Sequence, residues 1–366
     1  MKNNGGSSMD NLKLIVFDNC RELGIKVDEH LKKLTGSDKS HIIPINEVRF
    51  NNGEGKVLIL ETVRKKEIFV LSDIGNHSIT YKMFEYLNHK SPDDHFQDIV
   101  RVLCAIRNQA SSVSLVMPLL YSSRQHKRDG RESLDCAVAL QTLMDKNVKN
   151  IITFDVHDSN VQNAIPCSSF DNFYPTNIIL ENFISNEKVD NDNLLAVSPD
   201  NGAIKRTNFY ANMLGCELGG HFEKQRDIYK IVDGKNPILR HEYIGKDVKD
   251  KDIIIVDDMI ASGESMIDVA RELKARGAKQ IFMMSAYSLF TKGIDVFEKA
   301  YQEGLFTRLY TTNLSYVPEE AKEKEWLYQV DCSSYVAKII YTYYKGESIS
   351  PILEYRSKKL EDFARN

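Results

Sequence analysis

The sequence IIIVDDMIASGES, at residues 253–265, has the pattern of a buried strand, a short turn and the start of a helix. The apolar run Ile253–Val256 ends in two acids, Asp257 and Asp258, and the helical pattern begins near Met266. In open α/β sheets, ligands bind outside the carboxyl ends of the strands, and the amides of a helix N-terminus suit a phosphate. The segment therefore predicts a phosphate site whose acids hold sugar hydroxyls or a ligand-bound metal. The structural alternative is a strand end with a capping turn.

Strands of this kind alternate with helical patterns along most of the 366-residue chain. The expected strands are Lys13–Phe17, Lys56–Glu61, Ile68–Ser72, Val113–Met117, Asn150–Asp155, Leu194–Ser198, Asp252–Val256 and Gln280–Ala286. Amphipathic segments lie between several of them, at Gln97–Asn108, Leu134–Lys146 and Met266–Arg276. This order predicts βαβ units and mainly parallel sheets that helices cover on both faces.

The length of the chain predicts two domains, because a domain usually has about 100–200 residues. We expect two doubly wound α/β domains, at residues 11–175 and 176–366, after a disordered leader at residues 1–10. The polar stretch Phe222–Lys251 is long for a connection, so we expect it to be a functional or disordered loop. A second polar stretch, Asn186–Asn193, is also expected to be flexible.

Composition and charge exclude several classes of protein. The chain has 48 basic and 52 acidic residues and a net charge of −4, which argues against a general nucleic-acid binder. No run approaches the roughly 18 apolar residues that cross a membrane, so no membrane partner is expected. The six cysteines form no C-x-x-C pair, a pattern that indicates a reducing, cytoplasmic compartment. Among the histidines, His77, His89 and His95 are expected at the surface.

Five further motifs precede the 253–265 segment. They are FNNGE at 50–54, SRQHKR at 123–128, TFDVH at 153–157, SPDNGA at 198–203 and FEKQR at 222–226. The 253–265 segment by itself resembles the phosphoribosyl-diphosphate motif of type I phosphoribosyltransferases. Together and in this order, the six motifs resemble those of ribose-phosphate pyrophosphokinases, from about Ile43 to Ser348.

The resemblance implies two domains of the type I phosphoribosyltransferase fold, with the site between them. It also implies transfer of the diphosphoryl group of ATP to the 1-hydroxyl of ribose 5-phosphate, with Mg²⁺ as cofactor. The residues that match the family's motifs are Phe50, Asn52, Glu54, Arg124 and Gln125 for ATP; His157 and Asp200 for Mg²⁺; Lys224 and Arg226 for catalysis; and Asp257, Asp258, Ala261, Ser262, Gly263, Glu264 and Ser265 for ribose 5-phosphate. A homo-oligomer, dimer or hexamer, with allosteric phosphate and ADP sites, is common in the family.

Taken singly, most of these residues have a structural interpretation as well. Phe50 stacks on a purine or belongs to the core, and Arg124 binds a nucleotide or lies in a solvated basic loop. His157 binds a metal, directly or through water, or is a structural histidine. The cations Lys224 and Arg226 stabilise a transferring phosphate group or belong to an exposed charged run.

The chain departs from the family's usual motifs at several positions. The phosphate loop usually reads D-D-M-I-D-T-(G/A)-G-T, whereas this chain has Ala261 at the third acid and Glu264 at a glycine. The usual R-Q-D has become R-Q-H at His126, and the second glycine of S-P-D-x-G-G is Ala203. Because Glu264 brings negative charge to a phosphate loop, a noncatalytic regulatory homologue is one rival function. A phosphoribosyltransferase is another, although it needs only one such domain.

Overall fold

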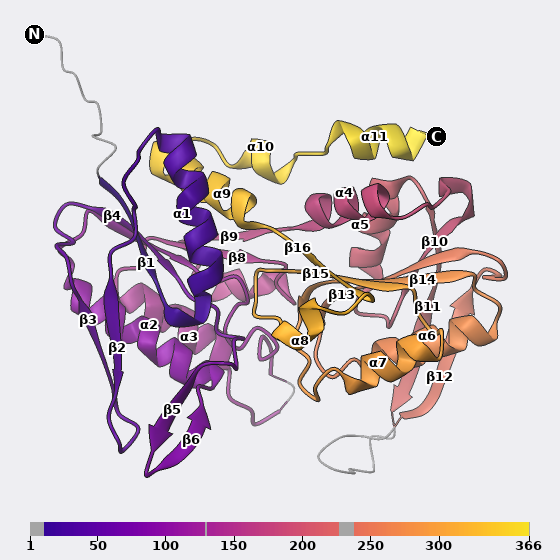
Figure 1. Cartoon of the computed structure of the whole chain (residues 1–366), viewed down its shortest axis with the longest axis horizontal. Coiled ribbons are helices and arrows are strands. Elements are labelled where there is room, and N and C mark those ends of the chain that lie inside the picture. Colours follow the sequence, from indigo (N-terminus) through magenta and orange to yellow (C-terminus); the bar gives the residue numbers. More distant parts are fainter. Residues whose placement is uncertain (1–10, 129, 227–237, 366) are drawn as a thin grey trace, which may run out of the picture. The chain divides into compact units, whose positions relative to one another are not determined.

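The computed structural model describes residues 11–128, 130–226 and 238–365, and the chain divides into two compact units (Figure 1). The first unit contains residues 11–174, Asn313–Tyr316 and Asp331–Glu354. The second contains Pro175–Thr312, Val317–Val330 and residues 355–365. The sequence prediction placed every residue after 175 in one domain, whereas two of these later segments pack with the first unit.

The first unit is built on a five-stranded parallel sheet in the order β1-β4-β7-β8-β9. The strands are β1 (Leu12–Val16), β4 (Glu67–Leu71), β7 (Ser112–Val116), β8 (Asn150–Phe154) and β9 (Ser169–Phe173). The helices are α1 (Arg21–Thr35), α2 (Pro92–Ile106), α3 (Asp135–Asp145), α9 (Ser333–Lys345) and the short α10 (Ser350–Leu353). In Figure 1, α1 and α9 lie on one face of this sheet and α2 and α3 on the other, as in a doubly wound fold.

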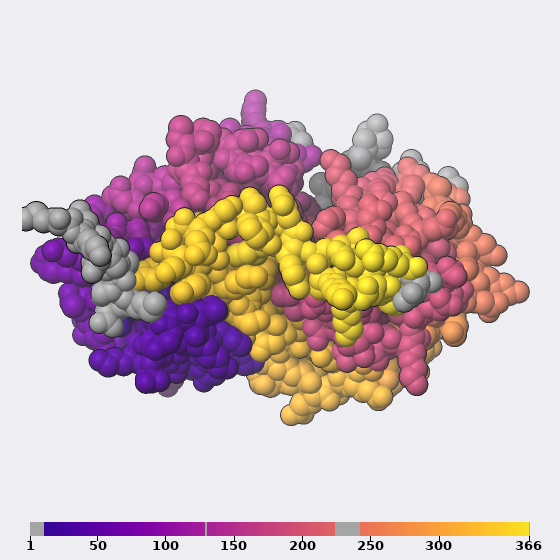
Figure 2. Space-filling view, turned by 90° about the horizontal axis from the view of Figure 1, so that it is seen from above, coloured from indigo at the N-terminus to yellow at the C-terminus, as the bar shows by residue number. Residues whose placement is uncertain are grey.

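Helix α9 comes late in the chain yet belongs to the first unit, because its aromatic side chains complete the core there. The ring of Tyr335 lies 6.0 Å from that of Phe154 in β8 and 6.3 Å from that of Phe173 in β9. Helix α9 also packs along α1, and Figure 2 shows these yellow and indigo segments side by side.

Two antiparallel ribbons extend the first unit beyond its sheet. One pairs β2 (Ile45–Arg49) with β3 (Gly55–Ile59), and the other pairs β5 (Thr80–Met83) with β6 (Tyr86–His89). The two ribbons are joined by a hydrogen bond of 2.9 Å from the Phe84 amide to the Asn51 carbonyl. Figure 1 shows them next to each other beside α2.

The second unit is built on a seven-stranded sheet in the order β12-β11-β10-β13-β14-β15-β16, parallel except for the β11–β12 pair. The strands are β10 (Leu194–Ser198), β11 (Glu217–Arg226), β12 (Ile238–Gly245), β13 (Asp252–Ile260), β14 (Gln280–Ser288), β15 (Arg308–Thr312) and β16 (Leu327–Val330). The helices are α4 (Thr176–Asn186), α5 (Ile204–Leu214), α6 (Glu264–Ala275), α7 (Asp295–Gln302), α8 (Glu319–Lys322) and α11 (Lys358–Arg365). Helix α11 packs on α4 and α5, as the yellow and rose segments of Figure 2 show.

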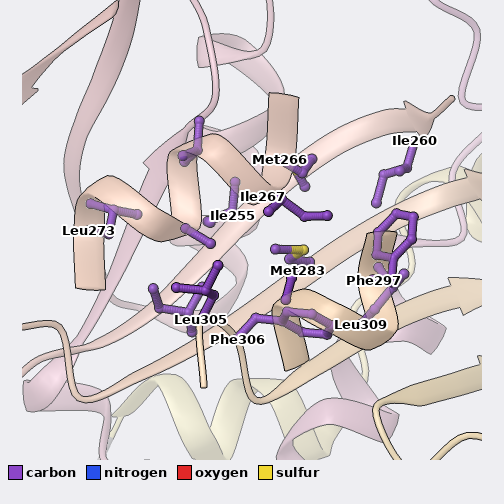
Figure 3. Close-up of a cluster of buried hydrophobic side chains, with 14 of the residues drawn as sticks. Ile255, Ile260, Met266, Ile267, Leu273, Met283, Phe297, Leu305, Phe306 and Leu309 are labelled. Atoms are coloured by element: carbon purple, nitrogen blue, oxygen red, sulfur yellow. The ribbon is translucent and has the colours of Figure 1, made fainter. Parts of the chain in front are cut away.

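The core of the second unit fixes the carboxyl end of β13 and the helix that follows it. Figure 3 shows Ile255 and Met283 of the sheet facing Ile267 and Leu273 of α6, with Phe297 of α7 beside them. All five side chains are buried. Burying side chains of this size stabilises the fold by about 1.5–3 kcal/mol each, so the loop between β13 and α6 is held between two well-packed elements.

The structure confirms the expected strands within two residues, except that β13 runs on to Ile260. The prediction that 222–251 is a functional or disordered loop is wrong for residues 222–226 and 238–245, which belong to β11 and β12, while 227–237 lie outside the described residues. The prediction that His95 is a surface residue is also wrong, since only 1% of it is exposed. Its ring is hydrogen-bonded to Asn19 at 2.9 Å and to the Asn76 carbonyl at 2.8 Å, which supplies polar partners inside the core.

Among the described helices, none has the length and hydropathy of a membrane-spanning segment. The six cysteines are free thiols.

Candidate active site

The predicted phosphate loop, residues 261–265, follows β13 and leads directly into α6. Gly263 caps the helix with a φ of +84°, a left-handed conformation that side chains disfavour. A Cβ atom at this position would lie 2.0 Å from Cζ of Phe297, so the loop has room only for glycine. The Ala261 carbonyl accepts a hydrogen bond of 3.0 Å from the Thr291 amide, which fixes the start of the loop.

The charge of Glu264 is balanced within the same unit. Its carboxylate accepts a hydrogen bond of 2.8 Å from Nζ of Lys292 and one of 3.3 Å from Oγ of Ser262. Both members of the ion pair are solvent-exposed, so the pair adds at most about 1 kcal/mol to stability. Its effect on the loop is electrostatic, because Lys292 offsets the negative charge that Glu264 brings.

Three carboxylates gather at the carboxyl ends of two neighbouring parallel strands. Asp200 follows β10, and Asp257 and Asp258 lie near the end of β13, which pairs with β10. Burial raises the pKa of Asp257 well above its ordinary value, and repulsion from Asp258 and then from Asp200 raises it further. The three acids are therefore close enough to interact, as carboxylates that hold a cation or hydroxyl groups would be.

Asp200 is fixed by the turn that carries it. Its Oδ1 accepts a hydrogen bond of 3.1 Å from the Ala203 amide, and its carbonyl accepts one of 2.7 Å from Oγ of Ser198. The turn keeps this hydrogen bond although Ala203 replaces the second glycine of the family's S-P-D-x-G-G motif. The Asp200 side chain thus takes part in the turn that leads into α5.

In the first unit, the FNNGE motif forms the turn between β2 and β3. The Phe50 amide donates to the Glu54 carbonyl at 2.8 Å, and Asn52 bonds the Glu54 carboxylate at 3.0 Å through Nδ2. Phe50 is 49% exposed, so it is not a core residue. The turn therefore presents an aromatic ring to solvent and keeps Asn52 and Glu54 in one rigid hydrogen-bonded arrangement.

The SRQHKR and TFDVH motifs meet at the ends of β7 and β8. Arg124, Gln125 and His157 are all exposed. The rings of His126 and His157 lie 5.5 Å apart, and Nε2 of His126 lies 3.4 Å from Oδ2 of Asp158. His126, which replaces the usual acid of R-Q-D, thus contacts the end of the strand that carries His157.

Lys224 and Arg226 belong to β11, where their backbones pair with His241 and Ile238 of β12. Their side chains are outside what the structure describes, so the roles predicted for them stay predictions.

The residues that the structure describes contain no group of three or more His, Cys, Asp or Glu arranged to hold a metal ion. The donor chemistry nevertheless fits Mg²⁺, which takes a few carboxylate oxygens and keeps several waters. Burial and then the charges of Asp258 and Asp200 raise the pKa of Asp257, and a bound cation would offset that negative charge.

Two residues of the site were missed by the sequence prediction. Lys292 lies 28 residues after Glu264, and only folding brings them together. Asp158 directly follows His157, so an acid adjacent to the motif was a signal in the sequence.

Comparison with known proteins agrees with this arrangement. Residues 12–146 match the family model of the N-terminal domain of ribose phosphate pyrophosphokinase, and residues 177–323 match that of the phosphoribosyl transferase domain. The chain is 23% identical over 347 residues to the ribose-phosphate pyrophosphokinase of Mycoplasmopsis pulmonis, covering 94% of this chain and 95% of that protein. It is 25% identical over 352 residues to that of Mycoplasma genitalium, covering 95% and 96%.

A solved structure shares the fold. The phosphoribosylpyrophosphate synthetase of Mycobacterium smegmatis superimposes with a TM-score of 0.76 at 22% identity, covering 92% of this chain and 99% of that one. The parallel sheets and the loop after paired strand-end acids define a protein of the phosphoribosyltransferase-like class. Within that class, the chain belongs to the ribose-phosphate pyrophosphokinase family.

Proposed function

We propose that this protein transfers the β,γ-diphosphoryl group of ATP to the 1-hydroxyl of ribose 5-phosphate. The 1-hydroxyl oxygen bonds to the β-phosphorus while the bond from that phosphorus to the α,β-bridging oxygen breaks. The products are 5-phospho-α-ribosyl 1-diphosphate and AMP, and the hydroxyl proton is released. The observation that carries the proposal is the cluster of Asp200, Asp257 and Asp258 beside a glycine-dependent phosphate loop whose Glu264 is balanced by Lys292.

The second unit binds the sugar phosphate in this proposal. The backbone of residues 261–265 cradles the 5-phosphate at the N-terminus of α6, where amides point toward a bound anion. Asp257 and Asp258 accept hydrogen bonds from the ribose hydroxyls. The close packing of Gly263 against Phe297 supports this role. A Cβ atom at residue 263 would collide with the Phe297 ring, so only glycine allows the loop backbone to lie where it does.

The first unit binds ATP. Phe50 stacks on the base, Asn52 and Glu54 contact its edge, and Arg124 and Gln125 hold the phosphates or the ribose. The exposed, hydrogen-bonded turn of residues 50–54 supports this assignment. His157 and Asp200 are the residues that would bind Mg²⁺, which would neutralise phosphate charge.

Lys224 and Arg226 are proposed as the catalytic cations. They lie on β11, which pairs with β10, the strand that leads to Asp200. Cations aimed at the transferring group stabilise the charge that develops on it, and such positioning supplies most of the catalysis in phosphoryl transfer.

The proposal also includes a cellular location and an oligomeric state. The free cysteines support a reducing, cytoplasmic location, and the family resemblance supports a homo-oligomer.

The test is AMP formation from ATP and Mg²⁺, with and without ribose 5-phosphate, beside a Lys224→Ala variant. We expect AMP that depends on the sugar phosphate and disappears in the variant. ATP binding without AMP formation would favour the noncatalytic homologue. Consumption of phosphoribosyl diphosphate with a free base, without ATP, would favour a phosphoribosyltransferase.

A further inference from the structure

A network of buried charges connects three elements of the first unit: β2, the end of the β5–β6 ribbon and α2. Lys90 lies between β6 and α2, and its Nζ donates to Glu47 of β2 at 2.7 Å and to Asp98 of α2 at 3.0 Å. The side chains of these three residues are each at most 8% exposed. Burial lowers the pKa of Lys90, but the charges of Glu47 and Asp98 outweigh this effect and raise it above its ordinary value. Lys90 is therefore a charged residue inside the unit.

The same network reaches the turn that carries Phe50. Asp98 also accepts a hydrogen bond of 2.8 Å from Nη2 of Arg49, the residue that precedes Phe50. Nη1 of Arg49 donates to the Gly53 carbonyl inside the turn at 3.3 Å. The position of the β2–β3 turn therefore depends on charges that Lys90 holds together.

Helix α2 also supports the second segment that we propose for ATP. The hydroxyl of Tyr121, three residues before Arg124, donates to Asp93 in the first turn of α2 at 2.7 Å. The Tyr121 ring stacks on that of Phe96, with centroids 4.5 Å apart and an interplanar angle of 13°. One helix thus anchors both the β2–β3 turn and the segment that leads to Arg124, so it sets the spacing between them.

A buried ionic network of this kind fixes geometry more than it stabilises the fold. Well-packed apolar side chains of similar volume often give equal or greater stability than a buried ion pair. An ion pair, however, restricts the fold to arrangements in which each charge meets its partner, because an unpaired buried charge is costly. The network therefore holds the β2–β3 turn in one position on α2 before any ligand binds.

We propose that Lys90 is a positioning residue for nucleotide binding, which holds the β2–β3 turn on α2 at the spacing where Phe50 and Arg124 bind one ATP molecule. Lys90 acts through Glu47 and Asp98 and does not contact the ligand. Without its charge, these two carboxylates lose the cation that they share and repel each other, which displaces β2 from α2. This inference rests on the proposed function, because it takes the β2–β3 turn and Arg124 as parts of the ATP site.

The variant Lys90→Met tests the proposal by calorimetric titration of the full chain with ATP and Mg²⁺. Because the turn must then be ordered at binding, we expect the Kd for ATP to rise about tenfold. The KM for ATP should rise by a similar factor with little change in kcat, and the KM for ribose 5-phosphate should not change. Lys90→Arg keeps a cation between the two carboxylates and should restore the Kd to within about threefold of the wild-type value.

Tyr121→Phe tests the other anchor on α2 by a milder change. It keeps the aromatic ring and removes the hydrogen bond to Asp93, so the Kd for ATP should rise about threefold. This variant replaces Lys90→Met in the test if Lys90→Met does not fold.

Two controls separate positioning from a general loss of stability. Lys82→Met removes an exposed lysine from the same β5–β6 ribbon. Asp28→Asn breaks another buried pair of the first unit, in which Oδ1 of Asp28 lies 2.9 Å from Nδ1 of His41. Both should leave the Kd for ATP unchanged, while urea unfolding reports the stability of each variant. A rise in Kd for Asp28→Asn equal to that for Lys90→Met would show a structural role only and overturn the proposal.

Binding of ATP separates this inference from the proposed function, because it needs no turnover. Binding that is weakened in Lys90→Met but kept in both controls supports the inference, even in a protein that makes no AMP. An unchanged Kd in Lys90→Met, or in Tyr121→Phe where that variant replaces it, would overturn the inference and leave the proposed function standing if AMP still forms. A wild-type protein that binds no ATP would overturn both.

Discussion

Replacing Gly263 with alanine perturbs the phosphate loop at the point where it is most closely packed. The new Cβ would lie 2.0 Å from Cζ and 2.5 Å from Cε2 of Phe297. Phe297 has little freedom to move away, because its ring stacks on Trp326 with centroids 5.6 Å apart and an interplanar angle of 16°. It also meets Phe290 edge-on at 5.1 Å.

Two effects contribute to the expected loss of stability. A side chain at a positive φ costs about 1–2 kcal/mol, and forcing an extra methyl group into a packed core costs about 1–3 kcal/mol. We therefore expect Gly263→Ala to lower the free energy of unfolding by about 2–5 kcal/mol. Because the collision pushes the loop away from Phe297, the KM for ribose 5-phosphate should also rise at least tenfold.

Gly304 provides the matched control. It has a φ of +70° but no neighbouring atom within 4 Å of its would-be Cβ, so Gly304→Ala tests the backbone contribution alone, about 1–2 kcal/mol. Urea unfolding and sugar-phosphate kinetics are measured on both variants and on Gly263→Ala/Phe297→Leu, which makes room for the methyl group. Equal destabilisation by Gly263→Ala and Gly304→Ala would refute the packing argument, and an unchanged KM would refute the role of the loop.

Three further predictions concern charge. Lys292→Ala should raise the KM for ribose 5-phosphate roughly two- to fivefold, because it removes the cation that offsets the charge of Glu264. Adding Glu264→Ala to the same protein should reverse this increase in KM, which steady-state kinetics would measure. Asp257→Asn should raise the melting temperature of the ligand-free protein at pH 7, because it removes a carboxylate whose raised pKa reflects an unfavourable charged form. A calorimetric scan that shows no rise in melting temperature would contradict this prediction. Burial raises the pKa of Asp73 from 3.8 to about 6, so the folded state holds its proton between these values and stability should fall as the pH rises from about 4 to 6. Urea unfolding across that window should show a smaller fall in Asp73→Asn.

The structural elements around the candidate site that were predicted correctly are those that depend on residues close together in the sequence. The β13 strand, its two acids and the glycine before α6 occupy consecutive residues, and an apolar run followed by a small-residue turn has few other structural interpretations. The same locality explains why apolar parallel strands such as β8, β10 and β14 were found. The parallel strands β9, β15 and β16 contain more polar residues and were missed.

The parts that were missed depend on contacts between distant residues. Strands β2, β5 and β6 belong to partly exposed ribbons, so they lack the continuous apolar run of the parallel strands. The burial of His95 depends on Asn19 and Asn76, and the balance of Glu264 depends on Lys292. Polar partners of this kind have no periodicity in the sequence, so composition alone placed His95 at the surface.

The position of α9 has a consequence for how the chain is made. Helix α1 ends at Thr35, but the helix that packs along it begins only at Ser333, after nearly all of the second unit. During synthesis the first unit therefore lacks helix α9 until residues 333–345 have been translated. Until then, the rings of Phe154 and Phe173 have no contact with Tyr335. Domains generally fold as units from the N-terminus onward, and a nascent chain with incomplete packing exposes apolar surface. For this protein, the half that is translated first cannot complete its fold until most of the second half has also been translated.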